Sequence, residues 1–92
     1  MSDVRSGTVP RVAAKARLEW DEVRQRHVLL YPEGLVALNA TAAEVLRLCD
    51  GERAIAQILE TLKQRYKSDQ IDSEVAALLN ALAAKGLVTY VR

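Results

Sequence analysis

The fold is decided by the stretch HVLLYPEGLVALNATAAEVLRLCDG, which runs from His27 to Gly51. It opens with two short apolar runs, residues 27–31 and 35–38, whose residue types are common in β-strands. Between them lies Tyr31-Pro32-Glu33-Gly34, a turn sequence because proline presets φ at the second turn position and glycine tolerates the exit conformation. The stretch therefore predicts two antiparallel strands joined by a tight turn.

A helix start follows the second run without a gap. Thr41 and Glu44 have the spacing of a capping box, in which each side chain accepts from the backbone amide of the other. This predicts a helix from Thr41 to about Cys49, which Asp50-Gly51 would end. Because the second strand ends three residues before the helix cap, we expect it to lie against that helix with its outer edge open to a partner.

One more strand precedes the hairpin. From Ala16 to Asp21 polar and apolar residues alternate, so that Leu18 and Trp20 share one face of the strand. A short polar link then leads to His27. The expected sheet has three antiparallel strands in meander order.

Two further helices and a closing strand follow the first helix. Periodic apolar residues predict one helix at about Ala54–Tyr66 and another that Asp72 caps and that runs to Lys85. Gly86 would end the last helix in a Schellman motif. The residues Leu87–Val91 predict a short final strand.

These elements predict an α+β fold that resembles a winged helix-turn-helix. It consists of a three-stranded antiparallel sheet followed by a three-helix bundle and a short C-terminal strand. Residues 1–15 show no sustained periodicity, so we expect a mobile N-terminal arm there and a single domain over residues 16–92.

The composition argues against catalysis and metal binding. A chain of 92 residues forms one small domain, in which a deep catalytic cavity is not expected. Cys49 is the only cysteine and His27 the only histidine, and no acidic residues are paired as an acid and a base. We therefore expect no enzyme activity, no metal and no cofactor. The N-terminus lacks a signal peptide and no run could span a membrane, so a cytoplasmic location is expected.

A winged-helix DNA-binding module is the alternative that this fold suggests. Its recognition element would be the last helix. Outside its apolar stripe, the charged residues of the last helix are Asp72, Glu74 and Lys85. Binding to DNA phosphates needs several basic residues. The net charge of +1 also disfavours a nucleic-acid partner.

Two features favour a peptide partner instead. The run Leu35–Leu38 contains no Lys, Glu or Pro, the residues that usually protect a strand edge from pairing. The small residues Ala77, Ala81 and Ala84 flank the apolar stripe of the last helix and could leave a groove. A strand edge beside a groove is the arrangement in which an extended peptide adds to a sheet as a further strand.

The chain resembles the PqqD family of pyrroloquinoline quinone biosynthesis, which belongs to the recognition elements for precursors of ribosomally synthesised, modified peptides. The resemblance covers residues 10–91. It rests on four blocks, Arg17-Leu18-Glu19-Trp20, His27-Val28-Leu29-Leu30-Tyr31-Pro32-Glu33-Gly34, Leu38-Asn39 and Leu48-Cys49-Asp50-Gly51.

The resemblance implies that the protein acts as a peptide chaperone. Its family captures the precursor peptide PqqA as an added strand between the third strand and the third helix. It presents the peptide to the radical S-adenosylmethionine enzyme PqqE, which cross-links a Glu and a Tyr of the peptide. By matching positions, the strand edge would be Leu35, Val36, Ala37 and Leu38. Positions on the helical wheel add Ser73, Glu74, Ala77, Asn80, Ala81 and Lys85 as the helix wall. Without peptide, we expect the open edge to allow a homodimer.

Overall fold

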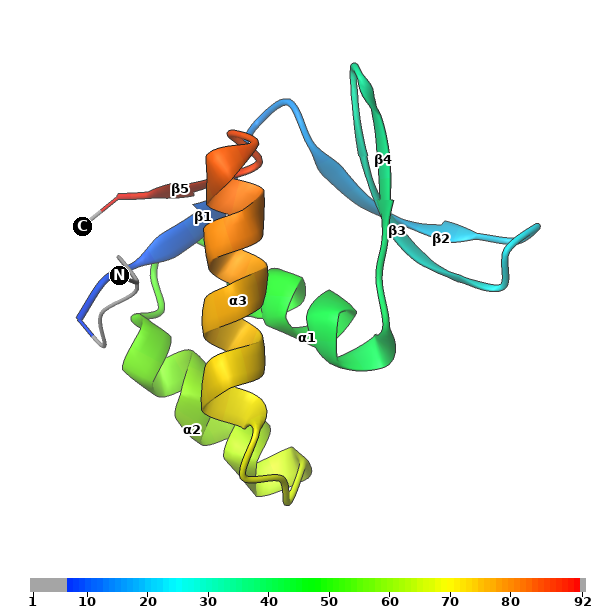
Figure 1. Ribbon diagram of the computed structural model, residues 1–92. Coiled ribbons are helices and arrows are strands. Elements are labelled where there is room, and N and C mark those ends of the chain that lie inside the picture. The colour runs from blue at the N-terminus through cyan, green and yellow to red at the C-terminus, as the bar shows by residue number, and fades with distance from the viewer. Residues whose placement is uncertain (1–6, 92) are drawn as a thin grey trace.

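The computed structural model describes residues 7–91 as five strands and three helices (Figure 1). In chain order these are β1 (Pro10–Val12), β2 (Arg17–Asp21), β3 (Arg26–Tyr31), β4 (Gly34–Ala37), α1 (Ala40–Leu48), α2 (Ile55–Arg65), α3 (Ile71–Ala84) and β5 (Val88–Tyr90).

The three-stranded sheet has the antiparallel order β2-β3-β4, as the sequence predicts. Leu29 on β3 lies between Leu18 on β2 and Val36 on β4, so these apolar side chains share one face of the sheet. Leu29 is fully buried and belongs to the main core. This face therefore rests on the helices, while both hairpins project beyond them (Figure 1).

The three predicted helices are confirmed, but α1 begins differently from the prediction. Its cap is Asn39, whose side-chain oxygen accepts from the Ala42 amide at 2.7 Å. The predicted capping box of Thr41 and Glu44 is wrong, because the Glu44 carboxylate accepts from Arg47 at 3.2 Å and from Arg65 at 2.9 Å. Glu44 thereby links α1 to α2 instead of capping α1.

The ends of α3 give one correction and one confirmation. The helix begins one residue before Asp72, which lies in the first turn and pairs with Lys63 of α2 at 2.7 Å. Gly86 has φ 73° and donates to the Ala83 carbonyl at 3.0 Å, and Leu87 donates to the Leu82 carbonyl at 2.9 Å. These two bonds are those of the predicted Schellman motif.

A second, two-stranded sheet corrects the prediction of a mobile arm over residues 1–15. β1 pairs antiparallel with β5, with Arg11 opposite Thr89. Val9, just before β1, is 5% exposed, and the Thr8 carbonyl accepts from the Ile55 amide at 2.8 Å. Residues 8–12 are therefore part of the domain, and residues 1–6 lie outside the described chain. Figure 1 shows this small sheet on one side of α3 and the larger sheet on the other.

Side chains tie the projecting sheet to the helices. The Arg47 guanidinium on α1 lies 2.9 Å from Nε2 of His27 on β3. The Trp20 ring of β2 also contacts the imidazole, edge to face, at a centroid distance of 4.9 Å. Since β4 pairs with β3, these contacts also hold β4 in position relative to α1.

Candidate functional site

The outer edge of β4 carries backbone amides and carbonyls that form no hydrogen bonds with any described strand. The Leu38 amide donates to the His27 carbonyl at 3.0 Å, which shows that position 38 directs its backbone groups toward β3. Backbone groups alternate in direction along an antiparallel strand. Val36 and Gly34 therefore also face β3, while the amides and carbonyls of Leu35 and Ala37 face outward. In residues 7–91, β4 is paired only with β3.

This edge lacks the features that usually prevent pairing. β4 contains no charged residue and no proline, and the Leu35 side chain is 38% exposed. Edge strands that must stay free of partners are normally protected by charges, by proline or by a bulge. The edge of β4 is thus chemically suited to accept another strand.

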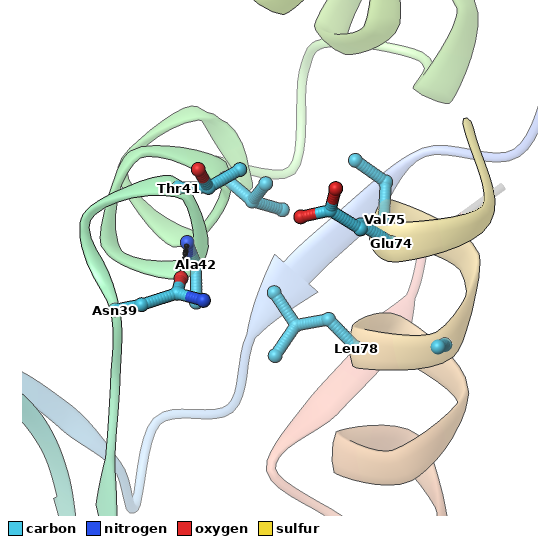
Figure 2. Close-up of a pocket in the computed structure, with 8 residues that line it drawn as sticks. Asn39, Thr41, Ala42, Glu74, Val75 and Leu78 are labelled. Carbon is cyan, nitrogen blue, oxygen red and sulfur yellow. Dashed lines mark hydrogen bonds between the residues drawn. The ribbon is translucent and has the colours of Figure 1, made fainter. Parts of the chain in front are cut away.

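A pocket of about 240 Å³ lies between the start of α1 and the first half of α3 (Figure 2). Its lining is mostly apolar, with polar atoms from residues near the two helix starts. The lining residues are Asn39, Thr41, Ala42, Val45, Glu74, Val75, Ala77 and Leu78. Figure 2 shows the Leu78 side chain extending from α3 toward α1. The pocket is therefore shaped to take an apolar side chain.

The pocket begins where the open edge ends. Asn39 lines the pocket, caps α1 and lies two residues after the last residue of β4. An extended chain that pairs with β4 and continues past Ala37 therefore reaches the pocket directly. The open edge and the pocket together form one candidate site, which we call the edge groove.

The structure distinguishes among the four predicted strand residues. Leu35 and Ala37 present their backbone groups outward, and Val36 is half-buried with its backbone groups toward β3. Leu38 lies outside the open edge of β4. It follows the end of β4, its side chain is buried, and its amide donates to the His27 carbonyl.

The six predicted helix residues fall into three groups of two. Glu74 and Ala77 line the pocket, and Ala81 and Lys85 are exposed farther along the same side of α3. Ser73 and Asn80 do not line the pocket. The Ser73 hydroxyl donates to the Gln70 carbonyl at 3.1 Å, and Asn80 is half-buried.

The α1 wall of the pocket is not among the predicted site residues. This wall consists of residues from α1 or its cap, whereas the sequence predicts only α3 residues for the helical part of the site. The residues are Asn39, Thr41, Ala42 and Val45. A usable signal was present, because the helix cap follows the edge strand within two residues. Any groove beside that edge must include the start of α1.

Neither a reactive thiol nor a metal cluster is found in residues 7–91. Cys49 is buried. Mainly because of this burial, and to a lesser extent because of the nearby Asp50 charge, the pKa of its thiol is raised to about 12. The thiol is therefore protonated at neutral pH and is not a nucleophile. No group of three or more His, Cys, Asp or Glu side chains in residues 7–91 is placed to hold a metal ion. Likewise, no helix in this part of the chain is long and apolar enough to cross a membrane.

Comparison with known proteins identifies the family. Residues 26–88, which include β3, β4 and all three helices, match the family described as coenzyme PQQ synthesis protein D, PqqD. The chain belongs to the PqqD family. Among its PqqD relatives, the PqqA binding protein of Rhodopseudomonas palustris strain TIE-1 is 45% identical over 85 residues, covering 90% of this chain and 83% of the relative. The PqqA binding protein of Methylococcus capsulatus is 36% identical over 81 residues, covering 88% and 87%.

A solved PqqD structure has the same fold. It is the solution structure of the PqqD part of Methylobacterium extorquens PqqCD, described as a functional, stand-alone recognition element for ribosomally synthesised and post-translationally modified peptides. It superposes with a TM-score of 0.81 at 37% identity and covers 96% of each chain. The predicted family and the predicted α+β fold are both confirmed.

Proposed function

We propose that this protein binds the precursor peptide PqqA by adding it to β4 as a further strand. The observation that carries the proposal is the open edge at Leu35 and Ala37, which leads directly into the pocket between α1 and α3. Relatives that are 36% to 45% identical bear the name PqqA binding protein. The edge groove supplies both parts of strand addition, since the backbone edge gives affinity and the pocket gives side-chain selectivity.

The protein's part in cofactor biosynthesis is to hold the peptide without modifying it. β4 has four residues, so only a short segment of a bound peptide can pair with it. The rest of the peptide stays outside the groove, where another protein can reach it. On this basis the complex presents PqqA to the radical S-adenosylmethionine enzyme PqqE. Size-exclusion chromatography tests this, because this protein, PqqA and PqqE should elute together as one complex. Elution of PqqE apart from the complex of this protein with PqqA would contradict the proposed presentation.

The alternative of a winged-helix DNA-binding module is less well supported. The first turn of α3 carries Asp72 and Glu74, and its last turn carries no basic residue. A helix that enters the major groove of DNA needs basic residues at these positions to contact the phosphates. The described surface of α3 therefore suits a peptide better than DNA.

Hydrogen exchange should locate the added strand residue by residue. With saturating PqqA, we expect the amides of Leu35 and Ala37 to become protected, because each would then donate to a peptide carbonyl. The Val36 amide already faces β3 and should change far less. Two-dimensional NMR of the ¹⁵N-labelled protein measures all three. Equal changes at the three positions, or none, would contradict strand addition at this edge.

Self-association should compete with peptide binding. Two copies that pair through β4 would use the same outward groups of Leu35 and Ala37 that the peptide needs. We therefore expect a weak dimer at high protein concentration that dissociates when PqqA is added. Sedimentation over a dilution series, with and without saturating peptide, checks this. A dimer that persists with peptide bound must use another surface.

A further inference from the structure

One side of α3 carries opposite charges at its two ends. Glu74, Leu78, Ala81 and Lys85 are spaced by four, three and four residues, which places them in a single row along the helix. The row begins with a carboxylate beside the pocket and ends with an ammonium group at the C-cap of the helix. The eleven-residue separation corresponds to about 16 Å along the helix.

Glu74 is the only charged residue among those that line the pocket. Figure 2 shows its carboxylate turned from α3 toward α1, over the space that the pocket occupies. No cation in residues 7–91 forms an ion pair with it, whereas Asp72 on the opposite side of the helix pairs with Lys63 at 2.7 Å. The pocket therefore offers an uncompensated negative charge at the edge of an apolar surface.

The other end of the row is basic. A Cβ atom at Gly86 would lie 3.7 Å from Nζ of Lys15. Lys15 is therefore close to the end of α3 that carries Lys85. Neither lysine forms an ion pair within the described chain. Lys15 lies just before β2, whose first residue is in register with Leu30 and, across β3, with Leu35. The two lysines therefore mark the Leu35 end of the edge groove, and Glu74 marks the end at Asn39.

From this arrangement we infer that the edge groove selects a peptide with a basic and an acidic residue at opposite ends of its bound segment. The inference rests on the proposed strand addition. The basic residue pairs with Glu74, and the acidic residue lies near Lys15 and Lys85. An extended chain covers 16 Å in about five residues, which sets the separation of the two charges. A peptide with the base before the acid then runs antiparallel to β4, so the charge order determines the direction of the added strand.

A helix dipole gives a simpler reason for the same charges. An acid in the first turn and a base at the end stabilise any helix. That role affects folding stability and leaves peptide affinity unchanged. Asp72 separates the two explanations, because it shares the first turn with Glu74 but faces away from the pocket and toward Lys63.

Calorimetric titration with PqqA at low salt tests the inference. We expect Glu74→Gln to weaken binding about fivefold and the reversal Glu74→Lys with Lys85→Glu to weaken it by roughly tenfold or more, since each lost attraction is that of an exposed ion pair. Both effects should shrink as salt is raised. Asp72→Asn should bind as the wild type does. A synthetic peptide with the acid and the base in the reverse order, about five residues apart, should bind the variant with Glu74→Lys and Lys85→Glu better than it binds the wild type.

The outcomes separate this inference from the proposed function. If the variant with Glu74→Lys and Lys85→Glu binds PqqA at low salt as tightly as the wild type does, the charge selection is wrong. Strand addition is tested separately by Ala37→Pro, which removes an outward-facing amide of β4. A nitroxide on the PqqA terminus nearer its basic residue should broaden the amide signals of Asn39 and Ala77. Broadening near Lys85 instead would overturn the inferred direction.

Discussion

Ala37→Pro is expected to weaken PqqA binding by about 1 to 3 kcal/mol while the protein stays folded. The Ala37 amide faces away from β3, so proline removes a donor to the peptide and no hydrogen bond of the sheet. Proline is tolerated on an edge strand when its missing amide is on the solvent side. The Ala37 side chain is exposed, so the proline ring meets no core residue. The loss should therefore appear in peptide affinity, measured by calorimetry.

Val36→Pro is the matched control, one residue away on the same strand. The Val36 amide faces β3, and its half-buried side chain packs against the core. Proline there removes a hydrogen bond of the sheet. We therefore expect Val36→Pro to lower the melting temperature more than Ala37→Pro does. If Ala37→Pro is folded and binds PqqA as the wild type does, the peptide does not pair with this edge.

Much of the fold could be predicted because its signals are local. The hairpin turn at Tyr31–Gly34 combines a proline and a glycine, and the register pairs Tyr31 with Gly34 as that turn requires. Gly86 adopts positive φ where the helical pattern stops. Such features depend on neighbouring residues, which a sequence shows directly.

The missed elements depend on contacts between distant residues. β1 is three residues long and contains Pro10, so it has no strand pattern of its own. It exists because β5, nearly eighty residues later, pairs with it. Similarly, both Asn39 and Thr41 are good helix caps, and the sequence does not show which of them the helix uses. The choice affects the site, since capping by Asn39 leaves Thr41 in the lining of the pocket.

Ala77→Trp is expected to weaken PqqA binding by about 10-fold or more. Ala77 is exposed and lines the pocket, so a larger side chain there can fill the space without disturbing the buried residues of α3. A peptide side chain that enters this pocket gains about 1.5 to 3 kcal/mol from burial, which filling the pocket would remove. Calorimetric titration gives the affinity, and circular dichroism shows whether the helices are retained.

Ala56→Trp on α2 is the control for this change. Ala56 is also an exposed alanine within a helix, and it lies outside the pocket between α1 and α3. We expect this variant to bind PqqA as the wild type does, because only the volume inside the edge groove should matter. Equal losses in both variants would indicate a general effect of added tryptophan. If Ala77→Trp is folded and binds as tightly as the wild type, the peptide uses the β4 edge without placing a side chain in the pocket.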